Sequence, residues 1–122
     1  MNKALARISS ASLDINDRGV LTFYIHVDYE DGMSQGIGGF ALDEYDEKLK
    51  RRVVTAYGCE VVRQLLLVLG VDNFSEMVNK DIWVLAEGTG LDIKPLGIQT
   101  LREDGSKSVV FKDILDQFKT KG

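Results

Sequence analysis

The side chains that could do acid–base or thiol chemistry are sparse in this sequence. It holds one histidine, His26, and one cysteine, Cys59. Thiol catalysis would need these two side chains paired, and no feature of the sequence orients them toward each other. We therefore interpret Cys59 as a small packed residue at the start of a helix, and His26 as a strand residue on a polar face.

Metal and phosphate chemistry have equally weak signals. One histidine and one cysteine do not supply a zinc site with several such ligands, and no Walker-type phosphate loop or dinucleotide fingerprint is present. Two acidic clusters could recruit a divalent ion, although solvated turns more often have this composition. The clusters are Asp28, Glu30 and Asp31, and Asp43, Glu44, Asp46 and Glu47. We expect a binding protein without metal or cofactor, and not an enzyme.

A glycine-rich segment, Ser34-Gln35-Gly36-Ile37-Gly38-Gly39-Phe40, lies inside an expected strand. Glycine weakens a strand because it has no side chain to pack, and it is expected where a ligand or another backbone approaches closely. A bulged or twisted strand explains the same residues. Taken alone, the segment favours this structural interpretation over a ligand site.

A second segment, Thr55-Ala56-Tyr57-Gly58, leads directly into the strongest helix pattern. Free backbone N–H groups at a helix start favour an anion, and Thr55 would add a hydroxyl donor. Tyr57 could stack on a base. An ordinary capped helix start is the alternative, and the better one if the segment is considered alone.

The first half of the chain predicts a three-stranded meander followed by a helix. Residues 21–30 alternate between apolar and polar side chains, as do residues 11–15 before the turn-forming stretch 16–19. Residues 33–42 form the third expected strand. Residues 60–69 predict a helix that ends at Gly70. Leu67 lies among the polar residues of this helix, so its apolar surface is wider than one core stripe and gives a reason for oligomerisation.

The second half predicts a helical turn at residues 73–78, capped by Asp72 or Ser75, strands at 81–86 and 92–101, and a short C-terminal helix over 110–118. Pro95 interrupts the last strand and indicates an edge or a bulge. With no linker or repeat, we expect a single domain over residues 1–122. The fold class is α+β: an antiparallel sheet of about five strands with one main helix packed on it and used for dimerisation, plus the short C-terminal helix.

Composition limits the partners. The net charge of −4 argues against a DNA-binding protein, but it allows a local basic pocket for a small phosphorylated ligand. A single cysteine fits a reducing compartment. Neither a signal-peptide pattern nor a membrane-spanning apolar run appears, so we expect a cytoplasmic protein that binds neither DNA nor a membrane.

Four features come in an order that resembles a known family: the strand at 21–29, the segment Ser34 to Phe40, the entry Thr55 to Gly58, and the helix with Val62-Arg63-Gln64-Leu65. The chain resembles the phage and prophage Thoeris anti-defence sponges, which sequester cyclic ADP-ribose signals made by bacterial TIR enzymes. The resemblance runs from about Ile8 to Leu101, most of the chain. It implies ligand binding without cleavage in an infected bacterial cell. It also implies homodimers that can assemble further into hexamers, with the ligand in a pocket shared between protomers.

The resemblance and the residue types together suggest the ligand contacts. We expect Thr55 and the Gly58 amide to hold phosphate, Arg63 or Lys94 to supply positive charge, and Tyr57 or Trp83 to stack on adenine. Asp92 or Gln99 could read a base edge or a ribose hydroxyl. The glycine-rich strand adds Gln35, Gly36, Gly39 and Phe40 to the expected ligand-binding set. A core position for Trp83 and a solvated one for Arg63 are the alternatives.

The expected function is therefore sequestration of a cyclic ADP-ribose-type signal, or of a cyclic oligonucleotide, which blocks bacterial anti-phage defence. Two other functions stay open. One is an enzyme that degrades a nucleotide, and the other is a module for protein–protein contact or assembly that uses the same apolar helix.

Overall fold

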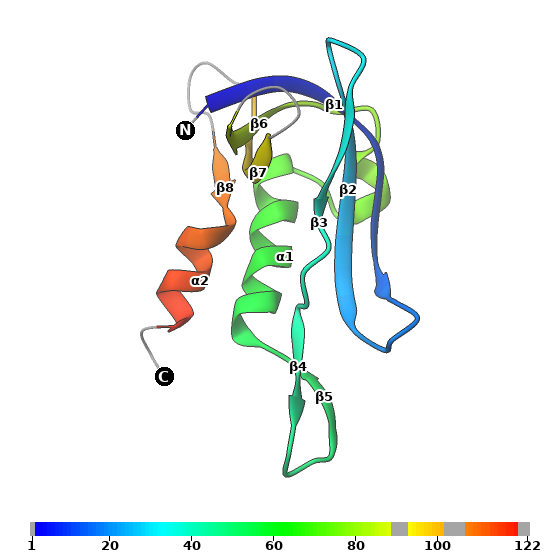
Figure 1. The fold of residues 1–122 in the computed structure, drawn as a ribbon, viewed down its shortest axis with the longest axis vertical. Helices are drawn as coiled ribbons and strands as arrows, with labels where there is room; N and C mark the ends of the chain where they lie inside the picture. Colours follow the sequence, from blue (N-terminus) through cyan, green and yellow to red (C-terminus); the bar gives the residue numbers. More distant parts are fainter. Residues whose placement is uncertain (1, 89–92, 102–106, 120–122) are drawn as a thin grey trace.

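The chain forms an antiparallel six-stranded sheet with helices against it and a separate two-stranded hairpin (Figure 1). The computed structural model describes residues 2–88, 93–101 and 107–119. The elements in chain order are β1 (Asn2–Ile15), β2 (Leu21–Tyr29), β3 (Ser34–Gly38), β4 (Asp43–Asp46), β5 (Arg51–Val54), α1 (Ala56–Leu69), the 3-10 helix η1 (Phe74–Met77), β6 (Asp81–Glu87), β7 (Lys94–Gln99), β8 (Ser108–Val110) and α2 (Phe111–Lys119).

Strand β1 is the longest strand and lies inside the sheet, whose order is β3-β2-β1-β6-β7-β8. Strand β2 pairs with one edge of β1 from Ala6 onward, and β6 pairs with the other edge from Asn2 to Arg7. The expected meander is confirmed, because β1, β2 and β3 are consecutive antiparallel neighbours. The Asn16 carboxamide closes the first turn by accepting from the N–H groups of Arg18 and Val20 at 2.9 and 3.1 Å.

The third strand is shorter than the expected span of residues 33–42. It ends at Gly38 because Gly38 and Gly39 have φ angles of 105° and 84°, outside the extended region that a strand requires. The backbone turns there, and the Gly39 N–H donates to the Phe23 carbonyl at 2.8 Å.

The expectation of about five strands is wrong, because eight strands are present among the described residues. The sequence reasoning missed the hairpin β4–β5 and the short strand β8. Pro95 lies at an irregularity of the β6–β7 ladder, where the pairing passes from Leu85–Gly97 to Ala86–Pro95. Strand β8 pairs with β7 only from Gly97 to Gln99, so Pro95 has no β8 residue beside it. Pro95 therefore lies at a bulge and at a part of β7 that β8 leaves uncovered.

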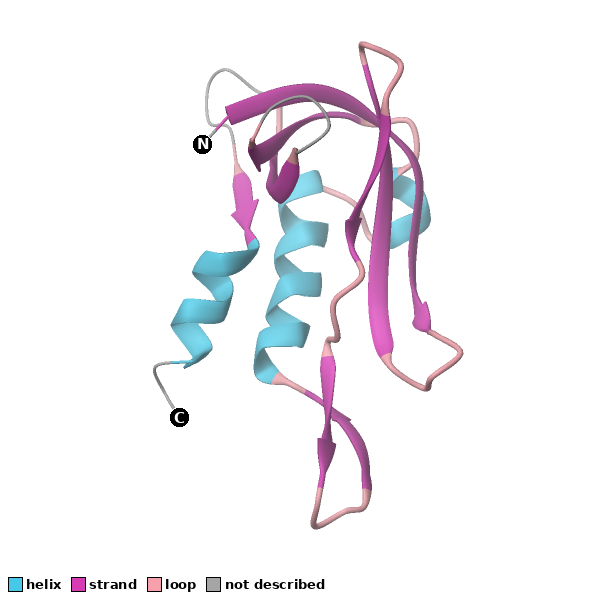
Figure 2. Ribbon diagram, viewed as in Figure 1, coloured by secondary structure: helices cyan, strands magenta, loops and turns pink. Residues whose placement is uncertain are grey.

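Helix α1 packs Val61, Leu65 and Leu69 on the sheet, and α2 lies alongside it (Figure 2). The expected helix over 60–69 is confirmed and begins earlier, at Ala56. Gly70 ends it in the left-handed region, at φ 66°. The C-terminal helix is also confirmed. The largest fully buried side chains come from the sheet, the segment after β3, η1 and both helices: Phe23, Ile8, Ile25, Ile37, Leu42, Leu65, Met77, Ile82, Ile98, Ile114, Val27 and Val61.

Burial of these side chains stabilises the fold by about 1.5–3 kcal/mol for each large one.

The 3-10 turn η1 is capped by Asn73, whose side chain accepts from the Glu76 N–H, and not by the expected Asp72 or Ser75. Among the residues that the structure describes, no helix combines the length and hydrophobicity needed to cross a bilayer.

The hairpin β4–β5 protrudes from the body of the molecule (Figure 1). Its base is fastened by Asp43, whose side chain is only 7% exposed. The Asp43 carboxylate accepts from Arg52 Nη2 and Nε at 2.8 and 3.0 Å and from the Leu21 N–H at 3.0 Å. The Arg52 hydrogen bonds hold the pKa of Asp43 below its usual value, against the opposing effect of burial. The second acidic cluster of the sequence therefore begins on this hairpin, where Asp43 is paired with Arg52.

We predict that Asp43→Asn destabilises the fold at neutral pH by about 1.5–3 kcal/mol, because a charged hydrogen-bonded partner of Arg52 is lost. Since the folded-state pKa is depressed, this contribution is fully present above about pH 4 and is lost as the pH falls through the folded-state value. Urea unfolding at pH 7 and at steps below pH 4 measures it. The exposed neighbour variant Glu44→Gln is the control, and a stability difference for Asp43→Asn that stays constant into acid would contradict the assignment.

Candidate functional site

The candidate site is a cleft of about 840 Å³ at the N-terminal end of β1. Strand β2 accompanies β1 only as far as the pair Ala6–Tyr29, whereas β6 continues to Asn2. Residues 2–5 therefore extend past the turn that joins β2 to β3, and the cleft lies beside them. The lining comes from β1, the β2–β3 turn, β6 and the start of β7: Lys3, Ala4, Leu5, Tyr29, Glu30, Asp31, Met33, Ser34, Gln35, Trp83 and Ile93.

One wall of the cleft is aromatic. Trp83 is half-buried on β6 and pairs across the ladder with Leu5 of β1. The Lys3 ammonium lies over the Trp83 ring, 5.7 Å from its centroid, a distance at which the ring attracts a cation. This wall offers a flat apolar surface with a positive charge above it.

A second wall is polar and internally bonded. The Tyr29 hydroxyl donates to Gln35 Oε1 at 2.6 Å, and Gln35 Nε2 donates to the Ile93 carbonyl at 2.8 Å. Gln35 thus ties the β2–β3 hairpin to the segment before β7. Burial raises the pKa of Tyr29, and the negative charge of Asp31 raises it further, so the phenol is neutral and a donor near pH 7.

Charge is distributed unevenly around the cleft. Lys3 is the cation on the aromatic wall, while Glu30 and Asp31 lie on the β2–β3 turn. One oxygen of Asp31 accepts from the Met33 N–H at 2.9 Å, which fixes the carboxylate in the turn. The arrangement can hold a planar group against Trp83, an anionic group near Lys3 and a hydroxyl donor near the carboxylates.

The structure explains the glycine-rich segment by close packing. A Cβ on Gly38 would lie 2.6 Å from the Phe23 carbonyl oxygen, and one on Gly39 would lie 2.6 Å from the Tyr24 hydroxyl. A Cβ on Gly36 would lie 3.4 Å from the His26 imidazole. Strand β2 therefore accounts for these glycines, and Gly36, Gly39 and Phe40 do not line the cleft. Phe40 packs in the core against Phe23 and Phe111.

The helix entry lies elsewhere, at the start of α1. The Thr55 hydroxyl accepts from the Gly58 N–H at 2.8 Å and donates to the Leu42 carbonyl at 3.1 Å. Tyr57 stacks on Phe40, with ring centroids 5.9 Å apart. The groups expected to hold phosphate are thus bonded to each other, which corresponds to the capped-helix alternative.

The other expected contacts are dispersed. Arg63 is exposed on α1 and pairs with Glu60 at 3.3 Å. Lys94 is exposed at the start of β7, and Gln99 is the cross-strand partner of Trp83. Asp92 lies outside the described residues. Of the expected ligand-binding residues, the structure brings Gln35 and Trp83 to the cleft.

The expected ligand-binding set did not include the other lining residues of the cleft, among them Lys3, Leu5 and Tyr29. Residues 3–8 alternate between outward and core-facing side chains, so an alternation count begun at the N-terminus would have extended the first strand to them. Of the catalytic-type residues, Cys59 is exposed on α1 and His26 stacks on Tyr24 in β2. Within the part of the chain that the structure describes, no group of three histidine, cysteine or carboxylate side chains is placed to hold a metal ion.

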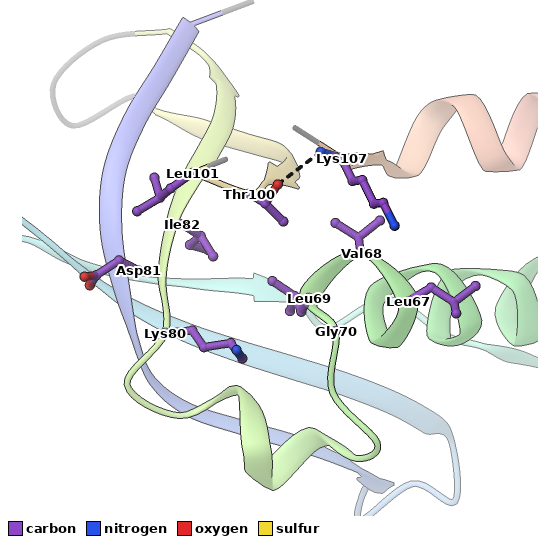
Figure 3. Close-up of a pocket in the computed structure, with 10 residues that line it drawn as sticks. All are labelled: Leu67, Val68, Leu69, Gly70, Lys80, Asp81, Ile82, Thr100, Leu101 and Lys107. Atoms are coloured by element: carbon purple, nitrogen blue, oxygen red, sulfur yellow. Dashed lines mark hydrogen bonds between the residues drawn. The ribbon is translucent and has the colours of Figure 1, made fainter. Parts of the chain in front are cut away.

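A second cavity of about 380 Å³ lies at the C-terminal end of α1 (Figure 3). Lys80 and Lys107 reach it from separate segments, on either side of Leu69 and Gly70. Lysines are favourable near this negative end of a helix. The cavity offers no aromatic ring among its described lining residues, and we regard the first cleft as the better ligand site.

No protein-family model matches the chain, and no curated protein or solved structure matches it either. Function is therefore inferred from the residues and geometry of the cleft.

We predict that Gly58→Ala destabilises the fold by about 1–3 kcal/mol through overpacking. An added Cβ would lie 2.1 Å from the Leu42 carbonyl oxygen, so the start of α1 would have to move away from that backbone. Urea unfolding measures the loss. The neighbouring exposed variant Cys59→Ala is the control and should change stability by less than about 0.5 kcal/mol. A fully stable Gly58→Ala chain would show that packing does not require this glycine.

Proposed function

We propose that the chain binds a cyclic ADP-ribose-type nucleotide in the cleft beside β1 and sequesters it without cleaving it. The observation that carries the proposal is the pairing of a half-buried Trp83 ring with the Lys3 ammonium on one wall of the cleft. Adenine stacks on such a ring, and a phosphate is attracted by such a cation. In an infected bacterium this binding would remove an immune signal and block anti-phage defence.

The size of the cleft supports a ligand of this class. Ligand sites commonly enclose about 300–1,000 Å³, and the cleft of about 840 Å³ lies within that range. Its lining combines apolar surface from Leu5, Trp83 and Ile93 with polar and charged side chains on β1 and the β2–β3 hairpin, and small-molecule sites use both kinds of group.

Sequestration also sets an affinity requirement. The free signal has to fall below the concentration that activates its effector, and a Kd of about 1 nM corresponds to about −12 kcal/mol. A nucleotide-degrading enzyme would meet the same biological need with weaker binding. Identification of the released ligand therefore separates the two functions.

We further propose that the chain associates with a second copy through the exposed apolar surface around Leu67 of α1. The expected wide apolar face is reduced in the structure, because Val62, Leu66 and Val68 pack partly against the core. Leu67 remains 57% exposed, and Leu101 is 41% exposed. Both leucines line the second cavity, at the C-terminal end of α1. These two leucines give the rim of the cavity apolar surface that a symmetric partner could cover.

For the ligand, we predict that a cyclic ADP-ribose isomer raises the thermal midpoint of the chain and is recovered unchanged by chromatography after heat denaturation. At a ligand concentration of about 100 times Kd, binding would add about 2.7 kcal/mol of stability. Trp83 is the only tryptophan, so its fluorescence reports directly on occupancy of the cleft.

Trp83→Ala should weaken binding by about 1–3 kcal/mol because the stacking surface is lost, whereas Trp83→Phe should retain most of the affinity. No midpoint shift with any isomer would refute nucleotide binding. Recovery of an altered product would point to catalysis.

For the helix, we predict that Leu67→Glu weakens self-association at least about 100-fold, since a symmetric contact loses the leucine twice. Sedimentation velocity across a concentration series measures it. Leu49→Glu is the matched control, because Leu49 is equally exposed, at 56%, but lies on the protruding hairpin. Equal effects of the two variants, or a monomeric unaltered chain, would rule out the α1 contact.

A further inference from the structure

The face of Trp83 that a base would use is already occupied in the structure. The Lys3 ammonium lies over the ring at 5.7 Å from the centroid. Lys3 is otherwise exposed and makes no ion pair with a described carboxylate. A planar ligand that stacks on the cleft side of Trp83 therefore has to displace this cation.

Once displaced from Trp83, the Lys3 ammonium can contact an anionic group of the ligand. The described acidic groups of the lining, Glu30 and Asp31, lie on the β2–β3 turn, while Lys3 lies on β1. A phosphate placed near the turn would meet two negative charges, whereas a phosphate placed near β1 would meet the freed ammonium. The distribution of charge thus orients a nucleotide in a single direction.

We propose that Lys3 is the specificity-determining residue of the cleft: it covers Trp83 when the cleft is empty, and it binds the ligand phosphate once a base has replaced it on the ring. The inference rests on the proposed function and deepens it. The recognised ligand is a nucleotide whose base and phosphate are close enough to occupy Trp83 and Lys3 together. A nucleoside without phosphate displaces the cation and gives it no new partner.

The two ligand types therefore respond to loss of Lys3 in opposite directions. Lys3→Ala should bind adenosine about two- to fivefold more tightly, because no cation–π contact has to be broken. The same variant should bind ADP about tenfold more weakly, because the charged contact to phosphate is gone. Lys3→Arg should keep the preference of the unaltered chain for ADP, since arginine retains the charge.

Isothermal titration calorimetry with adenosine, ADP and cyclic ADP-ribose tests the inference on the full chain. The control is Lys48→Ala, which removes the same charge from the exposed turn between β4 and β5, at the opposite end of the molecule from the start of β1 (Figure 1). Its affinities should equal those of the unaltered chain. Because Lys3→Ala also removes the cation–π contact with Trp83, its thermal midpoint without ligand should lie slightly below that of the control.

The expected result is opposite shifts for adenosine and ADP in Lys3→Ala alone. If the unaltered chain binds these ligands and Lys3→Ala changes both affinities equally, or neither, the inference is wrong and the proposed function stands. If the unaltered chain binds none of the three ligands, the proposed function fails and this inference fails with it.

Discussion

The staggered pairing of β1 is the constraint on which the rest of the structure depends. Strand β2 pairs with residues 6–15 of β1 and β6 with residues 2–7, so the two neighbours overlap only at Ala6 and Arg7. Beyond the overlap, the backbone of Ile8 bonds to Lys80 and Asn79, which precede β6. At the other end, residues 2–5 have β6 on one side and the cleft on the other. The same offset that lets one long strand join the two halves of the sheet also creates the candidate site.

The glycines illustrate how a sequence motif can be required by packing alone. Gly39 admits the Tyr24 ring, and Gly58 admits the Leu42 carbonyl, so the glycine-rich strand and the helix entry are fixed against β2 and the segment after β3. These are the motifs that resemble the anti-defence sponges. Their role in this structure is to set the fold, and they bear on ligand binding only through the elements that they position.

The sequence patterns correctly predicted those features of the fold that depend on neighbouring residues. The alternation of 21–29, the turn at Asn16 and the left-handed Gly70 were all predictable, because each depends on residues near in sequence. The hairpin β4–β5 was not, since its charged residues hide the alternation and its anchor, the Asp43–Arg52 pair, looks like a solvated cluster. The cleft was found only in part. It joins residues 3–5, 29–35, 83 and 93, and no periodicity specifies which of these distant segments meet.

The expected contacts in the cleft are too weak to account for nanomolar sequestration on their own. Stacking of a base contributes about 1–3 kcal/mol, and a charged contact to phosphate contributes about 1.5–3 kcal/mol. Their sum falls well short of the roughly −12 kcal/mol that nanomolar sequestration requires. The polar wall adds little, because Tyr29, Gln35 and the Ile93 carbonyl are already bonded to one another. Further affinity therefore has to come from surface that closes over the ligand. A partner that covers the cleft would supply that surface. The cavity that Leu67 and Leu101 line shares no described lining residue with the cleft, so contact at Leu67 and closure of the cleft are separate requirements.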